Sequence, residues 1–289
     1  MGSGGWARLR IDSHQHFWQY DAAEYGWIDD SMPGLRRDFL PKDSRREMTR
    51  AGFDACVAVQ ARQTLEETRW LLALAEAHPF IAGVVGWVDL QADDARAQIE
   101  RFAGHPKLVG IRHVVQSEPD VRFLLRREFC RGISLLHEFG LTFDILIYSR
   151  HLAVAAEFVA RFERQPFVLD HLAKPPIKAG QIDAWERDLR GLAAFPNVLC
   201  KLSGLVTEAD WHAWTPARIR PYLDVAFECF GPDRLMIGSD WPVCTLAADY
   251  ARAMAVVTDY IKTLSSGERQ AVTGGNAQRF WNLKTTVVS

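Results

Sequence analysis

Short apolar segments rich in β-branched residues alternate along the chain with longer segments of helical period. An apolar run of about four to eight residues between polar or turn-forming residues is typical of a buried strand. Apolar residues that recur every three to four positions indicate a helix with one buried face. We predict eight strands, over residues 9–15, 54–60, 81–89, 108–115, 141–148, 166–172, 197–204 and 234–240. We predict helices between them over residues 64–78, 121–139, 150–164, 182–195, 216–230 and 249–264.

The helix predicted over residues 64–78 has a recognisable start. Thr64 is followed three residues later by Glu67, and apolar residues then recur at helical spacing. In a capping box, the N-cap side chain accepts a hydrogen bond from the N3 amide, and the N3 carboxylate accepts one from the N-cap amide. We therefore expect Thr64 and Glu67 to cap each other.

The alternation of strands and helices predicts βαβ units and a parallel sheet of the α/β class. Eight repeats in a chain of 289 residues match a (β/α)₈ TIM barrel, which typically takes about 250 residues. An open doubly wound sheet is the alternative, and it is disfavoured because no Gly-x-Gly-x-x-Gly follows the first strand. No segment rich in Pro, Gly or Ser divides the chain, so we expect residues 1–289 to form one domain.

Residues 17–45 separate the first predicted strand from the second with aromatic residues, Pro33, Gly34 and Pro41. Loops of this length in compact domains are usually functional or mobile. We predict that residues 17–45 form a long first loop beside the active site. Residues 1–7 are expected to be a flexible leader, and its MGSGG start could be natural or a remnant of an expression tag.

Composition narrows the classes of partner. The hydrophobic content of 48% and the charged content of 24% are average for globular proteins. A formal net charge of −2 gives no reason to expect nucleic acid or an anionic membrane as a partner. No apolar run approaches the roughly 20 residues that span a bilayer, and the N-terminus lacks the apolar core of a signal peptide. A cytoplasmic location is the resulting expectation, and the sequence gives no oligomeric state.

Polar residues recur at the carboxyl ends of the predicted strands. In TIM barrels the chemistry occurs at this end. The residues are His14 and His16 on the first strand, Gln60 on the second, Arg112 and His113 on the fourth, Tyr148 and His151 after the fifth, Asp170 and His171 on the sixth, Lys201 and Ser203 on the seventh, and Asp240 and Trp241 on the eighth. Scattered surface residues would not collect at one end of successive strands.

Alternation along a strand indicates which of these side chains point together. His14 and His16 should share a face, with Asp12 on that face one step deeper. Gly238 should lie on the face of Asp240 and leave room beneath it. A closed barrel would bring His14 and His16 together with His171 and Asp240, so we predict these four as catalytic.

Structural roles remain as alternatives for single residues. A pair of nearby histidines fits hydrogen-bonded support as well as it fits a metal site. Lys201 could simply pair with an acid, because a buried lysine needs a partner. Trp27 and Trp241 could serve only in packing.

Five motifs, taken together, resemble a known family. They are IDSHQHFW (11–18), GIRH (110–113), VLDHLAKP (168–175), KLSGL (201–205) and IGSDWPV (237–243). The chain resembles the amidohydrolase superfamily, and within it the amidohydrolase 2 group that contains sugar lactonases. The second and fourth motifs are most similar to the L-fucono- and L-rhamnono-lactone hydrolase branch. Residues 274–283 resemble the closing helix of that group.

The resemblance implies a (β/α)₈ barrel with His14, His16 and Asp240 at the position of a metal site. It also implies His171 at the strand-six position and Asp240 as the acid or base. The predicted fifth strand has no lysine for a bridging carbamate, so at most one divalent cation, Zn²⁺, is expected. A metal-free route stays open, because some lactonases of this group are understood to use the histidines as donors instead.

The expected reaction is the hydrolysis of a small sugar lactone. Asp240 is the candidate general base, with a pKa that burial should raise. His14, His16 and His171 would hold Zn²⁺ or donate hydrogen bonds to the oxyanion. The residues expected to bind the sugar are Arg112, His113, Lys201 and His151, with Trp27 or Trp241 stacked on its ring.

Two other functions stay open. A metal-dependent decarboxylase or another hydrolase of the same superfamily would need the same strand-end residues. A carbohydrate-binding protein without catalysis is the second alternative, and it is disfavoured because a pure binder gains little from Asp240.

Overall fold

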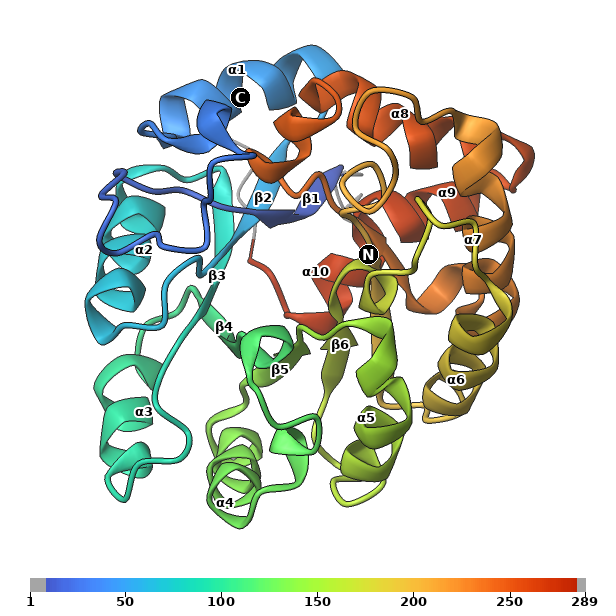
Figure 1. The fold of residues 1–289 in the computed structure, drawn as a ribbon. Helices are drawn as coiled ribbons and strands as arrows, with labels where there is room; N and C mark the ends of the chain where they lie inside the picture. The colour runs from blue at the N-terminus through green and yellow to red at the C-terminus, as the bar shows by residue number, and fades with distance from the viewer. Residues whose placement is uncertain (1–8, 285–289) are drawn as a thin grey trace, which may run out of the picture.

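The computed structural model describes residues 9–284, which form a barrel of eight parallel strands surrounded by helices (Figure 1). The strands pair in sequence order and are β1 (Ile11–Gln15), β2 (Ala55–Val59), β3 (Ile81–Gly86), β4 (Leu108–His113), β5 (Thr142–Ile145), β6 (Phe167–Leu169), β7 (Val198–Leu202) and β8 (Leu235–Ile237). Each lies within a predicted strand. The predicted (β/α)₈ fold is therefore confirmed. The predicted leader and its MGSGG start lie outside the described residues.

The barrel closes between β8 and β1 at the end where polar residues were predicted to collect. The Asp240 amide donates to the His14 carbonyl oxygen at 2.9 Å, and the His16 amide donates to the Trp241 carbonyl oxygen at 2.7 Å. These two bonds fix the backbone of both candidate histidines next to that of Asp240.

Eight helices alternate with the strands. They are α1 (Pro41–Ala51), α2 (Leu65–Ala77), α3 (Ala95–Ala103), α4 (Arg127–Leu136), α5 (Leu152–Val159), α6 (Asp183–Ala193), α7 (Pro216–Phe230) and α8 (Tyr250–Tyr260), followed by α9 (Ser266–Gln270), a π-helical turn (Ala271–Gly275) and α10 (Asn276–Phe280). The six predicted helices are confirmed. None of the helices within residues 9–284 is long and apolar enough to cross a membrane.

Of the helices that alternate with the strands, α1 and α3 were not predicted, and α1 corrects the extent of the first loop. The loop ends at Leu40, because α1 begins at Pro41. Both helices bury only three residues each, for example Met48 in α1 and Ile99 in α3. Their apolar stripes are too narrow to stand out from the surrounding polar sequence.

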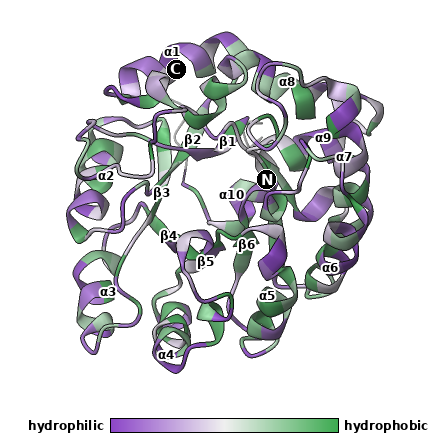
Figure 2. Cartoon of the chain, in the orientation of Figure 1, coloured by the Kyte–Doolittle hydropathy of each residue, from purple (hydrophilic) through white to green (hydrophobic). Residues whose placement is uncertain are grey.

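The apolar core has two parts. One fills the barrel with side chains such as Ile11, Val57 and Met236, and the other lies between the strands and the surrounding helices. Figure 2 shows the mostly apolar strands inside helices that mix apolar and polar residues. Trp281, after α10, packs with the inner group and donates to Thr142 Oγ1 at 3.0 Å. The inside of the barrel is therefore packed, and the opposite end carries the cavity described below.

The first loop is held by its own aromatic residues. Trp18 is fully buried, pairs with Phe39 in an isolated bridge and donates from its indole to the Arg37 carbonyl oxygen at 2.9 Å. The Tyr25 and Trp27 rings lie 5.8 and 5.7 Å from the Trp18 ring. This packing places the segment around Glu24 and Trp27 at the edge of the barrel mouth.

The cap predicted for α2 is half confirmed. The Glu67 amide donates to Thr64 Oγ1 at 3.1 Å, as the pattern requires. The Glu67 carboxylate does not return to the Thr64 amide. It accepts hydrogen bonds from the amides of Ala61 and Arg62 at 3.0 and 2.7 Å and thereby orders the loop after β2.

Candidate active site

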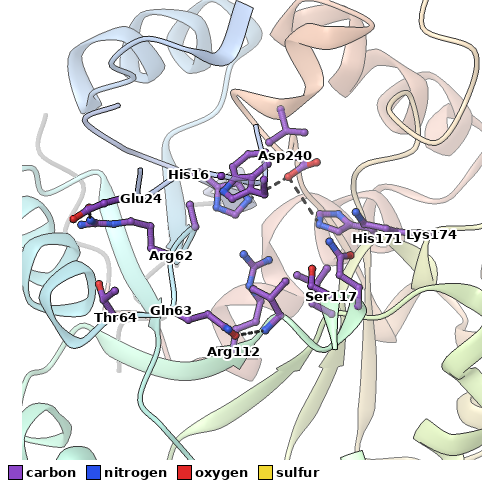
Figure 3. A pocket seen from close by; sticks show the side chains of 17 residues that line it. His16, Glu24, Arg62, Gln63, Thr64, Arg112, Ser117, His171, Lys174 and Asp240 are labelled. Atoms are coloured by element: carbon purple, nitrogen blue, oxygen red, sulfur yellow. Dashed lines mark hydrogen bonds and ion pairs between the residues drawn. The ribbon is translucent and has the colours of Figure 1, made fainter. Parts of the chain in front are cut away.

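A cavity of about 440 Å³ opens at the carboxyl ends of the strands (Figure 3). Its volume is within the usual range for small-molecule sites. Five of the predicted site residues line it, namely His16, Trp27, Arg112, His171 and Asp240. Glu24, Arg62 and Lys174 also line the cavity, and the sequence did not indicate these charged residues.

His14 and His16 point toward each other from the end of β1. Their Nε2 atoms are 3.2 Å apart. His16 Nδ1 lies 2.8 Å from the Val59 carbonyl oxygen, which can only accept, so Nδ1 carries a proton. His16 Nε2 faces Asp240 Oδ1 at 3.3 Å. A nitrogen and a carboxylate oxygen at this distance share either a proton or a bound cation.

Asp240 follows β8 in a left-handed conformation, with a φ of 58°. Gly238 is required beside it, because a Cβ at that position would lie 2.8 Å from the Cβ of His14. The room that Gly238 provides is therefore used by the His14 side chain rather than by Asp240.

The predicted pKa shift of Asp240 is wrong in direction. Burial alone would raise its pKa, but the adjacent His171, His16 and His14 side chains lower the pKa below its usual value. Asp240 is thus an ionised carboxylate at neutral pH.

His171 enters the cavity from an unusual turn after β6. Four consecutive residues, His171 to Lys174, have φ values of 53°, 53°, 56° and 52°. Left-handed backbone costs about 1–2 kcal/mol per residue for side chains with a Cβ. The turn places both His171 and Lys174 on the cavity wall.

Two residues that directly follow β7 hold the His171 ring in place. Its Nδ1 lies 2.8 Å from Ser203 Oγ, and a Cβ at Gly204 would lie 2.8 Å from the same nitrogen. Its Nε2 lies 3.9 Å from Asp240 Oδ1. Burial lowers the pKa of His171 to about 4, so the imidazole is neutral at neutral pH.

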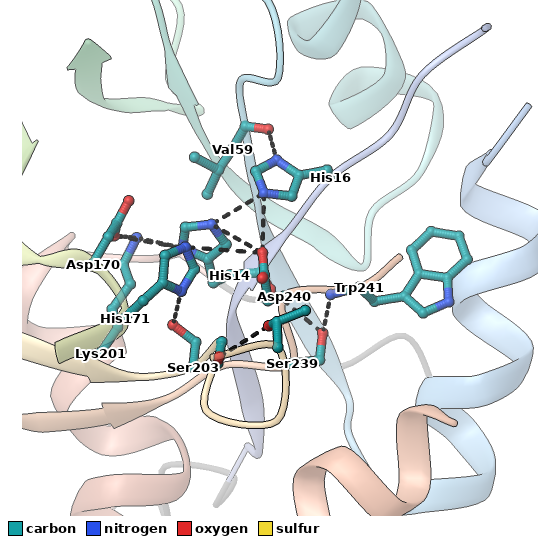
Figure 4. Close-up of polar contacts among 12 residues, drawn as sticks. His14, His16, Val59, Asp170, His171, Lys201, Ser203, Ser239, Asp240 and Trp241 are labelled. Carbon is teal, nitrogen blue, oxygen red and sulfur yellow. Dashed lines mark hydrogen bonds and ion pairs between the residues drawn. The ribbon is translucent and has the colours of Figure 1, made fainter. Parts of the chain in front are cut away.

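A buried cluster of charges lies directly beneath these groups (Figure 4). Lys201 Nζ contacts Asp144 Oδ2 and lies 2.9 Å from Asp170 Oδ1 and 3.2 Å from His14 Nδ1. Burial raises the pKa of Asp144 to about 7. Burial would also raise the pKa of Asp170, but Lys201 and His14 hold it well below its usual value.

Arg112 joins this cluster to the cavity. Its Nη1 lies 3.0 Å from Asp170 Oδ2, and its Nη2 donates to Gln60 Oε1 at 2.8 Å. Its Nη1 also lies 3.3 Å from His14 Nε2. Arg112 therefore combines a fixed position with contact to both the cavity and His14.

Four residues predicted to bind substrate do not line the cavity. Lys201 is fully buried beneath it, which is the structural alternative that the sequence left open. His113 stacks on Phe123 and contacts Glu118 at 2.7 Å. Trp241 packs on aromatic residues of the first loop, and His151 is buried with its Nδ1 on the Tyr148 amide.

Backbone geometry explains two of these displacements. Neighbouring residues point to opposite sides of a strand, so Arg112 and His113 cannot both face the barrel mouth. Asp240 and Trp241 lie beyond the end of β8, where Asp240 has a left-handed backbone and lines the cavity, whereas Trp241 packs on the first loop. All four residues were predicted at the site because their position along the chain does not show which way each side chain points.

The prediction for Asp12 is also wrong. Its carboxylate accepts hydrogen bonds from Gln15 Nε2 at 2.6 Å and from the Tyr250 hydroxyl of α8 at 2.9 Å. It therefore points away from the histidines, toward the helices. The pairing of β1 with β2 shifts register between Asp12 and Gln15, and this irregularity breaks the expected alternation.

The residues that sequence reasoning missed lie in loops and in one strand. Glu24, Arg62 and Lys174 line the cavity from the loops after β1, β2 and β6. No periodic pattern marks them, because loop conformation decides where they point. Asp144 was detectable, since it is a single carboxylate within the apolar segment TFDILIY.

Two groups of side chains could hold a metal ion. One is His14, His16 and Asp240, as predicted, and the other is His14, Asp170 and His171; in each group the ligand atoms lie within 4.8 Å of one another. Two ligands on a tetrahedral Zn²⁺ with bonds of about 2.0–2.1 Å are about 3.3 Å apart. The 3.2 Å between the Nε2 atoms of His14 and His16 fits this distance. The predicted group thus fits one Zn²⁺.

Comparison with known proteins decides the family. The family model described as Amidohydrolase matches residues 11–283. This chain belongs to the amidohydrolase family. Two members named L-fucono-1,5-lactonase are similar to it. The one from Burkholderia multivorans is 44% identical over 95% of this chain and 96% of its own, and the one from Burkholderia ambifaria is 40% identical over the same shares.

A solved amidohydrolase structure has the same fold. The crystal structure of an amidohydrolase from Burkholderia multivorans with bound zinc superposes with a TM-score of 0.92. The sequences are 44% identical, and the match covers 96% of this chain and 100% of that one. The resemblance to the amidohydrolase group is confirmed. That structure contains zinc, and this chain has two groups of side chains that could hold a metal ion.

Proposed function

We propose that this protein hydrolyses the lactone of a sugar acid to the open-chain aldonic acid. The observation that carries the proposal is the convergence on one carboxylate. Asp240 Oδ1 lies 3.3 Å from His16 Nε2 and 3.9 Å from His171 Nε2 at the wall of a cavity of small-molecule size. The names of the two similar amidohydrolases support the choice of a lactone.

Asp240 is the general base of the proposed reaction. It accepts a proton from a water molecule while the water oxygen forms a bond to the lactone carbonyl carbon. The ring C–O bond then breaks, and Asp240 returns the proton to the leaving oxygen. One water is consumed, and the new carboxylic acid ionises and releases one proton. A lowered pKa makes Asp240 a weak base, which suits a lactone because an ester is more reactive than an amide.

The oxyanion is stabilised by groups on the cavity wall. Arg112 contributes its positive charge from the cavity wall, while its N–H groups are held by Gln60, Asp170 and His14. His171 is neutral. We assign its proton to Nε2, which lies 3.9 Å from the Asp240 carboxylate, so that Nδ1 accepts from the Ser203 hydroxyl. Preorganised donors of this kind typically contribute more than any other single effect in acyl transfer.

His14, His16 and Asp240 would hold a Zn²⁺. When bound, Zn²⁺ supplies a Lewis acid that polarises the carbonyl oxygen. Loss of activity after exhaustive chelation, with recovery on adding Zn²⁺, would support an essential metal. If elemental analysis shows that the protein is metal-free and it is still fully active, the side chains alone stabilise the oxyanion.

A panel of aldonolactones, assayed with a pH indicator, tests the proposed function. We expect proton release from L-fucono- or L-rhamnono-lactones that depends on enzyme concentration. The main alternative is a decarboxylase of the same superfamily, which would release carbon dioxide from an acid. Carbon dioxide from aromatic acids, with no lactone hydrolysed, would overturn the proposal.

A further inference from the structure

We propose that the lactone carries no charged group, and that Glu24 and Arg62 form the subsite for its hydroxyl groups. This inference rests on the proposed function and narrows its substrate class. Among residues 9–284, the lysine and arginine side chains that line the cavity are Arg62, Arg112 and Lys174.

Each of these cations has a carboxylate partner. Arg62 forms an ion pair with Glu24. Arg112 Nη1 lies 3.0 Å from Asp170 Oδ2. Lys174 Nζ lies 3.7 Å from Glu208 Oε1. A substrate carboxylate would find no uncompensated cation among them, and burying an unpaired charge is strongly unfavourable. The cavity therefore favours a neutral ligand.

The Arg62–Glu24 pair is suited to hydroxyl groups. A guanidinium only donates hydrogen bonds and a carboxylate only accepts them, whereas a hydroxyl does both. Adjacent hydroxyls of a sugar can donate to Glu24 and accept from Arg62 without adding charge. Trp27, in the same loop as Glu24, lines the cavity with 40% of its surface exposed and offers a face for the C–H groups of the ring.

The pair lies at the correct side of the cavity for this role. Figure 3 shows Glu24 and Arg62 across the cavity from His171 and Lys174. A lactone with its carbonyl beside Asp240 and His171 would extend its remaining hydroxyls toward the pair.

A hydrogen bond to the backbone amide of Arg62 fixes the position of this residue. The Glu67 carboxylate is fully buried and accepts a hydrogen bond from the Arg62 amide at 2.7 Å. The Arg62 guanidinium lies 5.4 Å from the centre of the Tyr25 ring, which belongs to the packed first loop. Glu67 is thus a positioning residue for the subsite, and the subsite is built before substrate arrives.

Two matched lactones test the inference. L-Galactono-γ-lactone is neutral, and galactaro-γ-lactone has a carboxylate in place of the terminal hydroxymethyl group. For the wild-type enzyme we expect kcat/KM to favour the neutral lactone by about a hundredfold, as unpaired burial of a charge requires. Equal kcat/KM for the two lactones would overturn the inference and leave the proposed function standing. Hydrolysis of no lactone at all would overturn the proposed function itself.

A charge change in the subsite gives a second, gain-of-function test. Glu24→Gln removes the nearer of the two carboxylates beside the Arg62 guanidinium and leaves Glu67 Oε1 3.9 Å from its Nε. Less of the Arg62 charge is then compensated, so the preference should shift toward galactaro-γ-lactone by about tenfold or more. Arg62→Met should instead raise KM for the neutral lactone about tenfold and give no gain with the charged one. The matched control is Glu66→Gln, because Glu66 pairs with Arg69 at 4.0 Å on the exposed side of α2. A shift for Glu24→Gln no larger than that of Glu66→Gln would overturn the assignment of the pair.

Discussion

The guanidinium of Arg112 lies against the imidazole nitrogen of His14 that a metal ion would need. Arg112 Nη1 is 3.3 Å from His14 Nε2, and the same nitrogen is 3.2 Å from His16 Nε2. A guanidinium is a donor with a permanent charge. It therefore competes with a divalent cation for the lone pair and also repels that cation.

Removing the Arg112 charge should strengthen zinc binding. We expect Arg112→Met to bind Zn²⁺ about tenfold or more tightly, a conservative figure because unit charges about 4 Å apart interact by about 4 kcal/mol at an effective dielectric constant near 20. The measurement is a competition titration against a chromophoric chelator. Arg122→Met, which removes an exposed arginine paired with Glu157 at 2.9 Å, is the control. Unchanged or weaker zinc binding by Arg112→Met would contradict the competition.

Lys201 should matter for folding more than for substrate contact. Lys201→Met leaves Asp144 and Asp170 without their shared ammonium partner, and breaking a buried pair typically costs about 3–5 kcal/mol. Urea unfolding at neutral pH measures the loss. Adding Asp144→Asn to the same chain should restore part of the stability, since it removes one uncompensated carboxylate. A loss below about 1 kcal/mol, typical of exposed ion pairs, would show that the cluster is not held together in this way.

Glu67 should give the stability a pH dependence. Burial raises its pKa to about 7, above the value of about 4.3 in an unfolded chain. The folded state then holds a proton that the unfolded chain has lost, so the free energy of unfolding falls as pH rises from about 4 to about 7. Between about pH 5 and pH 8, the wild type should lose on the order of 2–3 kcal/mol more than Glu67→Gln does. Equal pH dependence in urea unfolding of both proteins would show that Glu67 titrates normally.

The sequence predicted the barrel because strands and helices of a (β/α)₈ fold carry different periods. All eight strands and six helices were found from these periods. Helices α1 and α3 escaped because each buries only three side chains. A polar helix of this kind is stabilised mainly by packing on the sheet. Its sequence has too few apolar residues to show a helical period.

The site was predicted only in its strand-end part, for a similar reason. The ends of β1, β6 and β8 meet in any closed barrel, so His16, His171 and Asp240 could be brought together from their positions in the chain. The orientation of Asp12 depends on a register shift, and that of Lys174 depends on a left-handed turn. Neither feature follows from residue type. Glu24 and Arg62 meet through two loops, which only the folded structure brings together.

Asp240→Asn tests the central claim most directly. Asparagine keeps the size of the side chain but cannot accept the proton from water, and general base catalysis is typically worth about 10²–10⁴-fold. The measurement is kcat/KM for proton release from an L-fuconolactone, with Asp93→Asn as the control, because the Asp93 side chain is fully exposed. The proposal predicts that Asp240→Asn loses at least about a hundredfold while its unfolding midpoint shows that the fold is retained. A folded Asp240→Asn enzyme with activity close to that of Asp93→Asn would contradict it.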